Sequence, residues 1–335
     1  MSRPSLPRRL ALAASLALGA ASPAFADTSL LNVSYDVTRE LYKEINPAFI
    51  AQWKAKKGET LTINQSHGGS TKQSQSVAAG LEADVVTMNQ SPDVDSLVSA
   101  GYVDKDWRGD FPNQAAPYTT TTVFIVRKGN PKGIKDWDDL TKPGYGVIVP
   151  NPKTSGNGRY TYLAAWGYAV TKTGNENKAR DFVKALFRNV PVLDGGGRGA
   201  TTTFAQRGIG DVLITFENEA GLIRKEFGED QFDVIYPSLS IEAAAPVAIV
   251  DKVVDRHGTR AQAKAYLDFL WSPAGQDIIA RQGFRPRDKA VFRKYAAQFP
   301  AIKTFTVEDK LGGWTKVQAQ HFADGGIYDE IIVNK

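Results

Sequence analysis

Residues 66–73 read SHGGSTKQ, and this short stretch combines residue types that serve three kinds of chemistry. Glycines before a hydroxyl residue and a lysine are typical of nucleotide-binding loops. A serine close to a histidine suggests a nucleophile and its base. A chain that turns into a helix after such glycines offers backbone N–H groups that hold an anion without reacting with it.

The spacing excludes the nucleotide loop, because the motif G-x-x-x-x-G-K-[ST] is absent: Lys72 follows Ser70 and Thr71, and only two glycines stand directly before Ser70. A hydrolase would use Ser70 as nucleophile and His67 as base, but no G-x-S-x-G elbow is present. We interpret His67 as a packing or hydrogen-bonding residue beside the site. We therefore expect no enzymatic activity, with the serine hydrolase kept as the alternative of a different class.

The elements around this stretch alternate between short apolar strands and amphipathic helices, which predicts an α/β fold with mostly parallel sheets flanked by helices. The same order resumes after residue 117. In open α/β sheets, ligands bind beyond the carboxyl ends of the strands. The first elements are expected at 30–35, 38–58, 60–66, 71–81 and 83–88.

Two long β-branched strands, YTTTTVFIV and AAAPVAIVD, stand between complete α/β units and are interpreted as crossings between two lobes. A chain that crosses twice makes one lobe discontinuous, and the cleft between the lobes is the expected ligand site. We predict a first lobe at 27–117 plus 248–290, a second at 118–247, and a helical tail at 291–335 that packs back on the lobes.

Residues 1–26 have the pattern of a secretory signal peptide, with three arginines, a short apolar run and Ala24-Phe25-Ala26 before Asp27. Cleavage after Ala26 lowers Lys+Arg from 41 to 38 against 36 Asp+Glu, so the mature chain carries +2 instead of +5. The chain has no cysteine and therefore no disulfide or thiolate site. It also lacks a dense Lys/Arg face with interleaved aromatic residues, which argues against nucleic acid as a partner. We expect a monomeric periplasmic protein without metal or cofactor.

Four strand-to-helix junctions carry small or hydroxyl residues where a backbone can approach a ligand. Each helix start exposes N–H donors and about half a positive charge. Several such starts aimed into one cleft would bind a compact anion without a salt bridge. The junctions lie at Asp36, Ser70, Ser155 with Gly156 and Asn157, and the glycine-rich turn before Arg198.

Long motifs along the mature chain resemble the periplasmic sulfate- and thiosulfate-binding proteins of ATP-driven (ABC) importers. They are LLNVSYDVTRELY, INQSHGGSTKQ, PNPKTSGNGRYTYLAAWGYA, GGRGATTTFAQRGIGDVLITFENEA and GGWTKVQAQHFADGG. The resemblance implies a two-lobed solute-binding protein of type II that holds a dehydrated oxyanion between its lobes and delivers it to membrane permease subunits for sulfur uptake.

The resemblance also implies which residues hold the anion. A tryptophan of sulfate-binding members is replaced here by Phe216, which cannot donate an indole hydrogen bond. With Phe216 and Asn157, the chain resembles the thiosulfate-binding branch more than the sulfate-binding branch. The implied backbone donors are Asp36, Ser70, Gly156, Asn157 and Gly197, and Ser155 supplies a hydroxyl.

Two questions stay open at the level of sequence. Phosphate is the alternative ligand if the Asp36 carboxylate faces the cleft, because a protonated oxyanion needs an acceptor. If that carboxylate caps its own helix, phosphate is rejected. Arg159 and Arg198 lie beside the donors, and we expect them to brace loops or pair with carboxylates such as Asp194 or Glu217 rather than touch the anion.

Overall fold

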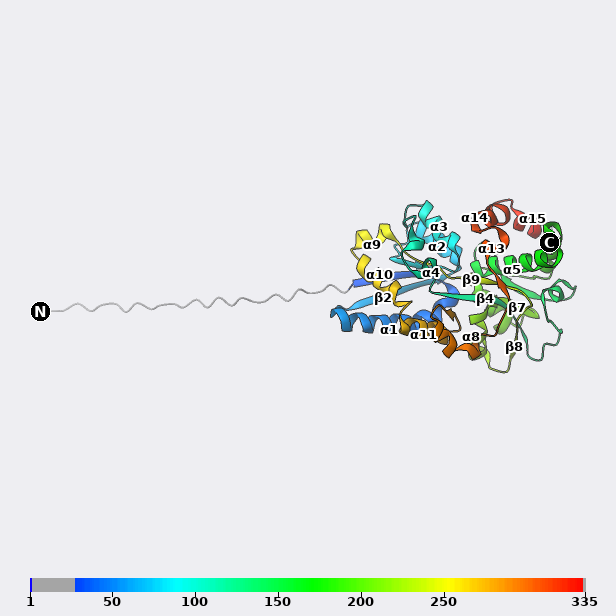
Figure 1. The fold of residues 1–335 in the computed structure, drawn as a ribbon, viewed down its shortest axis with the longest axis horizontal. Coiled ribbons are helices and arrows are strands. Elements are labelled where there is room, and N and C mark those ends of the chain that lie inside the picture. The colour runs from blue at the N-terminus through cyan, green and yellow to red at the C-terminus, as the bar shows by residue number, and fades with distance from the viewer. Residues whose placement is uncertain (2–27, 334–335) are drawn as a thin grey trace.

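The computed structural model describes Met1 and residues 28–333, so the signal-peptide prediction lies outside the described residues. Two α/β lobes lie side by side, and the chain contributes early and late segments to each of them (Figure 1). No helix among the described residues combines the length and the apolar character needed to span a membrane.

The first lobe is built around a four-stranded sheet with the order β10-β3-β1-β2. β1 (Thr28–Tyr35) pairs in parallel with β2 (Leu61–Gly68) and with β3 (Val85–Thr87), and β10 (Val247–Ile249) is antiparallel to β3. The carboxyl ends of β1, β2 and β3 therefore meet at one edge of the sheet. The helices of this lobe are α1 (Arg39–Lys57), α2 (Ser70–Ala78), α3 (Ser91–Ser99), α9 (Asp251–His257), α10 (Arg260–Phe269) and α11 (Pro273–Arg281).

The second lobe contains a larger mixed sheet with the order β12-β9-β4-β7-β5-β6. Its long strand β4 (Tyr118–Arg127) is buried almost throughout and is antiparallel to all of its partners, whereas β5 is parallel to β6 and β7. Continuous burial explains the run of β-branched residues in β4. The other strands are β5 (Val147–Pro150), β6 (Leu193–Asp194), β7 (Val212–Phe216), β8 (Phe232–Ile235), β9 (Ser240–Ala244), β11 (Arg285–Pro286) and β12 (Thr304–Phe305).

Longer helices cover the second sheet, and short helical segments complete both lobes. The longer helices are α5 (Gly156–Thr173), α6 (Glu176–Arg188) and α8 (Glu217–Phe227). The short ones are α4 (Pro112–Ala115), α7 (Gly197–Thr201), α12 (Lys289–Lys294), α13 (Val307–Leu311), α14 (Trp314–Val317), α15 (Ile327–Val333), η1 (Asp36–Thr38), η2 (Trp107–Gly109), η3 (Trp137–Thr141), η4 (Thr202–Gln206), η5 (Ala296–Gln298) and η6 (Gln318–Phe322).

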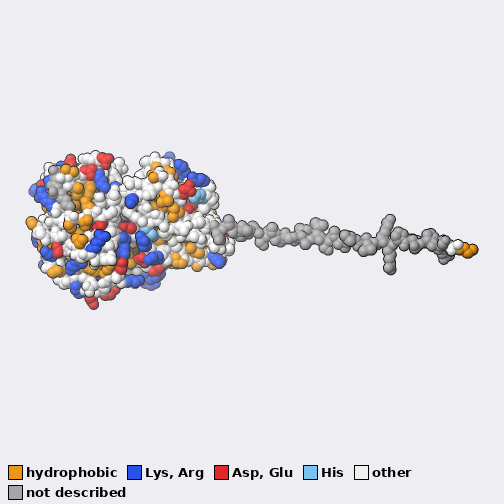
Figure 2. All heavy atoms as spheres, turned by 180° about the vertical axis from the view of Figure 1, so that it is seen from behind, with side chains coloured by type: hydrophobic (Ala, Val, Ile, Leu, Met, Phe, Trp, Pro, Cys, Tyr) orange, Lys and Arg blue, Asp and Glu red, His pale blue; other side chains and the backbone are white. Residues whose placement is uncertain are grey.

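The chain passes from one sheet to the other between β9 and β10, which are separated only by Ala245 and Pro246. The segment after residue 290 contains a strand as well as helices, because β12 pairs with β9, and its α15 packs on α6 of the second lobe. On the face shown in Figure 2, cationic and anionic side chains are interspersed, and no broad area carries one sign of charge.

Candidate functional site

Four strand-to-helix junctions, two from each lobe, come together between the sheets. Gly69, between β2 and α2, lies so close to the second lobe that an added methyl would stand 2.5 Å from the carbonyl oxygen of Thr154 and 2.6 Å from that of Gly195. Such contacts are possible only without a side chain. The structure therefore brings together the junctions that the sequence analysis singled out.

The Asp36 carboxylate lies at the start of α7 in the opposite lobe. Its Oδ2 accepts the backbone N–H of Arg198 at 3.0 Å, and a methyl on Gly196 would collide with it. Burial raises the pKa of this carboxyl group, while the N–H groups of Arg198, Asp36 and Gly197 oppose the rise. The alternative in which Asp36 caps its own helix is wrong, because no side chain caps η1 or α1 and the carboxylate accepts its hydrogen bond from the other lobe.

The hydroxyl of Ser70 is engaged inside the first lobe. Its Oγ donates to Asp93 Oδ2 at 2.6 Å and accepts the backbone N–H of Asn89 at 3.2 Å. The residue before α2 is Gly69, and no side chain caps this helix. The S-x-x-Q spacing of Ser70 and Gln73 is typical of a capping box, which predicts that the Ser70 hydroxyl caps α2. This prediction is wrong, because the hydroxyl bonds to the buried Asp93 carboxylate instead.

His67 is not paired with a serine in the described part of the chain. Its Nδ1 is buried without a hydrogen-bond partner there, and the ring borders a separate hollow with Arg39 and Tyr42. Burial, and then the charge of Arg39, lowers the pKa of His67 to about 4, so the imidazole is neutral at pH 7. A serine–histidine hydrolase therefore has no catalytic pair at this site.

The start of α5 supplies the third junction. Ser155 is the residue before the helix, and its Oγ accepts the N–H of Gly158 at 3.4 Å, which leaves the hydroxyl hydrogen free to point elsewhere. Asn157 Nδ2 donates to Thr215 Oγ1 at 2.9 Å. The first turn of this 18-residue helix is buried, so its N–H groups face the protein interior.

Both arginines beside the junctions are held by protein groups. Arg198 pairs with Glu226 at 2.6 Å and lies 3.7 Å from the fully buried Glu219. Glu226 and Glu219, rather than Asp194 and Glu217, are therefore the carboxylates beside Arg198. Asp194 instead accepts a hydrogen bond from the Thr203 hydroxyl, and Glu217 forms an ion pair with Arg285. That part of the prediction is wrong: Arg198 points along α8 instead of back toward β6.

Arg159 is 6% exposed and lies under the loop that precedes α5. Its Nε donates to the carbonyl oxygen of Pro152 at 2.8 Å, and its guanidinium stacks 5.1 Å from the ring centroid of Phe322. Burial lowers the pKa of Arg159, and the Asp93 carboxylate of the other lobe opposes this change. Arg159 thus braces the loop that carries Ser155.

Phe216 ends β7 and is fully buried. Its ring meets Tyr160 edge to face at 5.8 Å between centroids, and Tyr160 in turn meets Trp314 at 5.4 Å. Thr215, the preceding residue, is the hydrogen-bond partner of Asn157. The ring is therefore packed against the start of α5.

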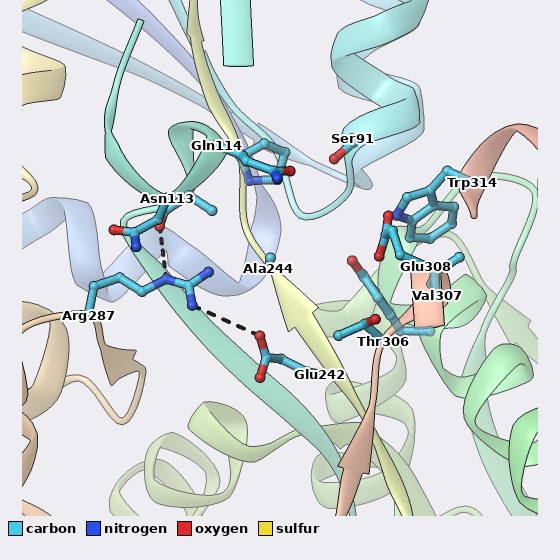
Figure 3. Close-up of a pocket in the computed structure, with 13 residues that line it drawn as sticks. Ser91, Asn113, Gln114, Glu242, Ala244, Arg287, Thr306, Val307, Glu308 and Trp314 are labelled. Atoms are coloured by element: carbon cyan, nitrogen blue, oxygen red, sulfur yellow. Dashed lines mark hydrogen bonds and ion pairs between the residues drawn. The ribbon is translucent and has the colours of Figure 1, made fainter. Parts of the chain in front are cut away.

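A second hollow of about 360 Å³ contains none of the predicted donors (Figure 3). Glu242 and Glu308 contribute carboxylates to it, and Arg287 lies 3.9 Å from Glu242. Two carboxylates make this hollow unsuited to a dianion. Nor do residues 28–333 gather three or more His, Asp or Glu side chains into a group that could hold a metal ion.

Sequence reasoning missed the junction after β3, where Asn89 and Asp93 lie. The signal was present, because the strand Val85–Thr87 is followed by a polar stretch and then by α3, as at the other junctions. Both residues are buried and contact Ser70.

Comparison with known proteins agrees with this architecture. Residues 30–285 match the model of a family described as bacterial extracellular solute-binding proteins. The chain belongs to this family. It is 60% identical to a thiosulfate-binding protein of Pseudomonas aeruginosa over 321 residues, which cover 96% of each chain. It is 55% identical to a sulfate-binding protein of Escherichia coli over 315 residues, covering 94% of this chain and 96% of the relative.

The solved structure of the sulfate-binding protein SubI from Mycobacterium tuberculosis superimposes with a TM-score of 0.81 at 36% identity, covering 88% of this chain and 99% of the other. A periplasmic thiamin-binding protein shares the fold alone, with a TM-score of 0.65 at 16% identity. The fold class and the family resemblance predicted from sequence are confirmed, and these relatives are binding proteins, not enzymes.

Proposed function

We propose that this solute-binding protein captures thiosulfate and sulfate outside the cytoplasm and delivers them to the permease subunits of an ABC importer for sulfur uptake. The observation that carries the proposal is the meeting of four buried strand-to-helix junctions while both neighbouring guanidinium groups are held by protein groups. The backbone and hydroxyl donors at the helix starts are the groups that we propose to contact the anion.

In this proposal the donors surround a fully ionised, dehydrated anion. The N–H groups stand at helix starts, whose dipoles favour negative charge. The Ser155 hydroxyl has its hydrogen free, since its oxygen already accepts from Gly158. Backbone N–H groups of Asp36, Ser70, Gly156, Asn157 and Gly197 complete the set, with Phe216 as an apolar wall.

Phosphate is the alternative ligand, and it carries a proton at neutral pH. The proton would need an acceptor, and the acceptor considered at the sequence level was the Asp36 carboxylate. This carboxylate accepts the N–H of Arg198 at 3.0 Å. Because Oδ2 is engaged by this N–H and the other groups proposed at the site are donors, we infer that sulfate and thiosulfate, which need no acceptor, bind in preference to phosphate.

Phe216 supports a preference for thiosulfate. A phenyl ring adds no donor, and the sulfur atom of thiosulfate accepts hydrogen bonds weakly, so it loses little beside an apolar ring. Sulfate presents an oxygen there and loses one charge-assisted bond, worth about 1.5–3 kcal/mol.

The export route and the lobe limits belong to the same proposal. The precursor loses residues 1–26 and the mature chain works as a monomer in the periplasm. Lobe 1 comprises 27–117 and 248–290, lobe 2 comprises 118–247, and the tail 291–335 packs on them. The pairing of β10 with β3, and of β4 within the second sheet, supports this division.

Isothermal titration of the mature protein tests the proposal, with thiosulfate, sulfate and phosphate added in turn to dialysed protein in an oxyanion-free buffer. We expect saturable 1:1 heats for the first two anions, tighter binding of thiosulfate, and no heat for phosphate. The absence of a binding heat for both thiosulfate and sulfate would refute the proposed function.

A further inference from the structure

Asn89 is a buried residue, and neither polar atom of its side-chain amide has a hydrogen-bond partner among the described residues. The residue follows β3 and is 3% exposed. Its Oδ1 is buried without a hydrogen bond, and its Nδ2 donates to no group among residues 28–333. Buried polar groups are normally satisfied, so an unpartnered amide needs an explanation.

The position of Asn89 links both sides of the cleft. Its backbone N–H donates to Ser70 Oγ at 3.2 Å in the first lobe. Its side chain reaches the second lobe and packs on Gly156, where an added methyl would collide first with Oδ1 and would lie 2.5 Å from Cγ and 2.8 Å from Nδ2. Asn89 thus contacts two of the residues whose N–H groups are proposed to hold the anion.

We propose that Asn89 is an additional ligand contact, whose side-chain amide donates a hydrogen bond from Nδ2 to the bound oxyanion. The inference rests on the proposed function and deepens it. A turn of the amide by 180° exchanges Oδ1 and Nδ2 without changing its shape, so either end can face the cleft. A fully ionised anion accepts hydrogen bonds only, which selects the Nδ2 end.

This contact would depend on the approach of the two lobes. The backbone of Asn89 belongs to the first lobe, whereas its amide lies on the start of α5 in the second. The amide therefore reaches an anion held at Gly156 only when the lobes are together. Its loss is expected to raise the rate at which the ligand leaves.

Three single variants test the inference by titration with thiosulfate and with sulfate. Asn89→Ala removes the donor and should weaken binding about 10- to 100-fold, as expected for a hydrogen bond to a charged group. Asn89→Asp places a carboxylate beside the anion and should weaken binding at least tenfold further. The control Asn64→Asp changes an exposed residue of β2 and should bind as the parent does.

The melting temperature of each variant without ligand verifies that it is folded, and Asn89→Ala alone decides the outcome if Asn89→Asp does not fold. Binding by Asn89→Ala within threefold of the parent would overturn the inference. Equal losses in Asn89→Ala and Asn89→Asp would do so too, because a residue that only positions Ser70 does not sense the charge. If the parent binds phosphate and Asn89→Ala does not, Oδ1 and not Nδ2 faces the ligand, which contradicts the inference. Failure of the parent to bind either sulfur oxyanion would refute the proposed function itself.

Discussion

Gly69→Ala should prevent the two lobes from closing on an anion without disturbing either lobe. The backbone at Gly69 has φ −58° and ψ 132°, which any residue adopts, so the substitution introduces no local strain. The added methyl would stand 2.5 Å from Thr154 O and 2.6 Å from Gly195 O, both backbone atoms that cannot rotate away. The β2–α2 junction must therefore move off the second lobe.

The size of the effect follows from that displacement. An ordinary contact begins at 3.4 Å, so the 2.5 Å approach has to open by about 0.9 Å. A hydrogen bond of normal length stretched by this amount is no longer one. Loss of two bonds to a charged ligand removes at least about 3 kcal/mol, which is more than a hundredfold in Kd.

Isothermal titration with thiosulfate and sulfate measures this loss, and thermal unfolding without ligand measures the stability of the lobes. The matched control is Gly221→Ala in α8, where an added methyl meets nothing within 4 Å. We expect the control to bind normally and both variants to unfold near the parent temperature. A Gly69→Ala protein that binds within threefold of the parent would show that the contact at Gly69 is not part of the bound state.

Three further predictions concern other parts of the site. Phe216→Trp adds an indole donor and should raise sulfate affinity about 10- to 100-fold with less change for thiosulfate in competition titrations; an unchanged ratio would contradict the role of the ring. Asp36→Asn keeps an oxygen for the Arg198 N–H, so anion affinity should stay within about tenfold, and a collapse would mean that the carboxylate touches the ligand. Burial raises the pKa of Glu219 to about 7 from 4.5, so its ionisation destabilises the folded protein increasingly as pH rises from about 4.5 to 7. Glu219→Gln should then be more stable than the parent by on the order of 3 kcal/mol at pH 8 and nearly equal to it at pH 4 in denaturant unfolding; a difference that does not vary with pH would refute this assignment.

The elements and their junctions could be predicted from the sequence because they depend on local patterns. Alternation of apolar strands and amphipathic helices predicted β1, β2 and α2 at nearly their observed bounds. The helix starts after β2 and β5 followed from glycines and hydroxyl residues at the strand ends. These signals need only a few neighbouring residues.

Contacts between distant segments could not be predicted in the same way. Asp36 and Arg198 are 162 positions apart, and Asn89 meets Gly156 only because two sheets face each other. The wrong capping box at Ser70 has the same origin, since Asp93 reaches the hydroxyl from the next junction. The two-residue strand β12 was also missed, because its pairing with β9 is set by tertiary packing rather than by periodicity.

The hydrogen bond from Arg198 N–H to Asp36 consists of protein atoms only, and it joins the two lobes. It therefore stabilises the closed shape whether cargo is present or not. A membrane partner that sensed only the separation of the lobes would sometimes bind the protein without an anion and start a transport cycle that moves nothing. Transport efficiency then depends on how far the bound anion shifts the equilibrium between separated and joined lobes beyond the effect of this hydrogen bond. A weaker hydrogen bond would lower anion affinity, but the joined lobes would then report more reliably that an anion is bound.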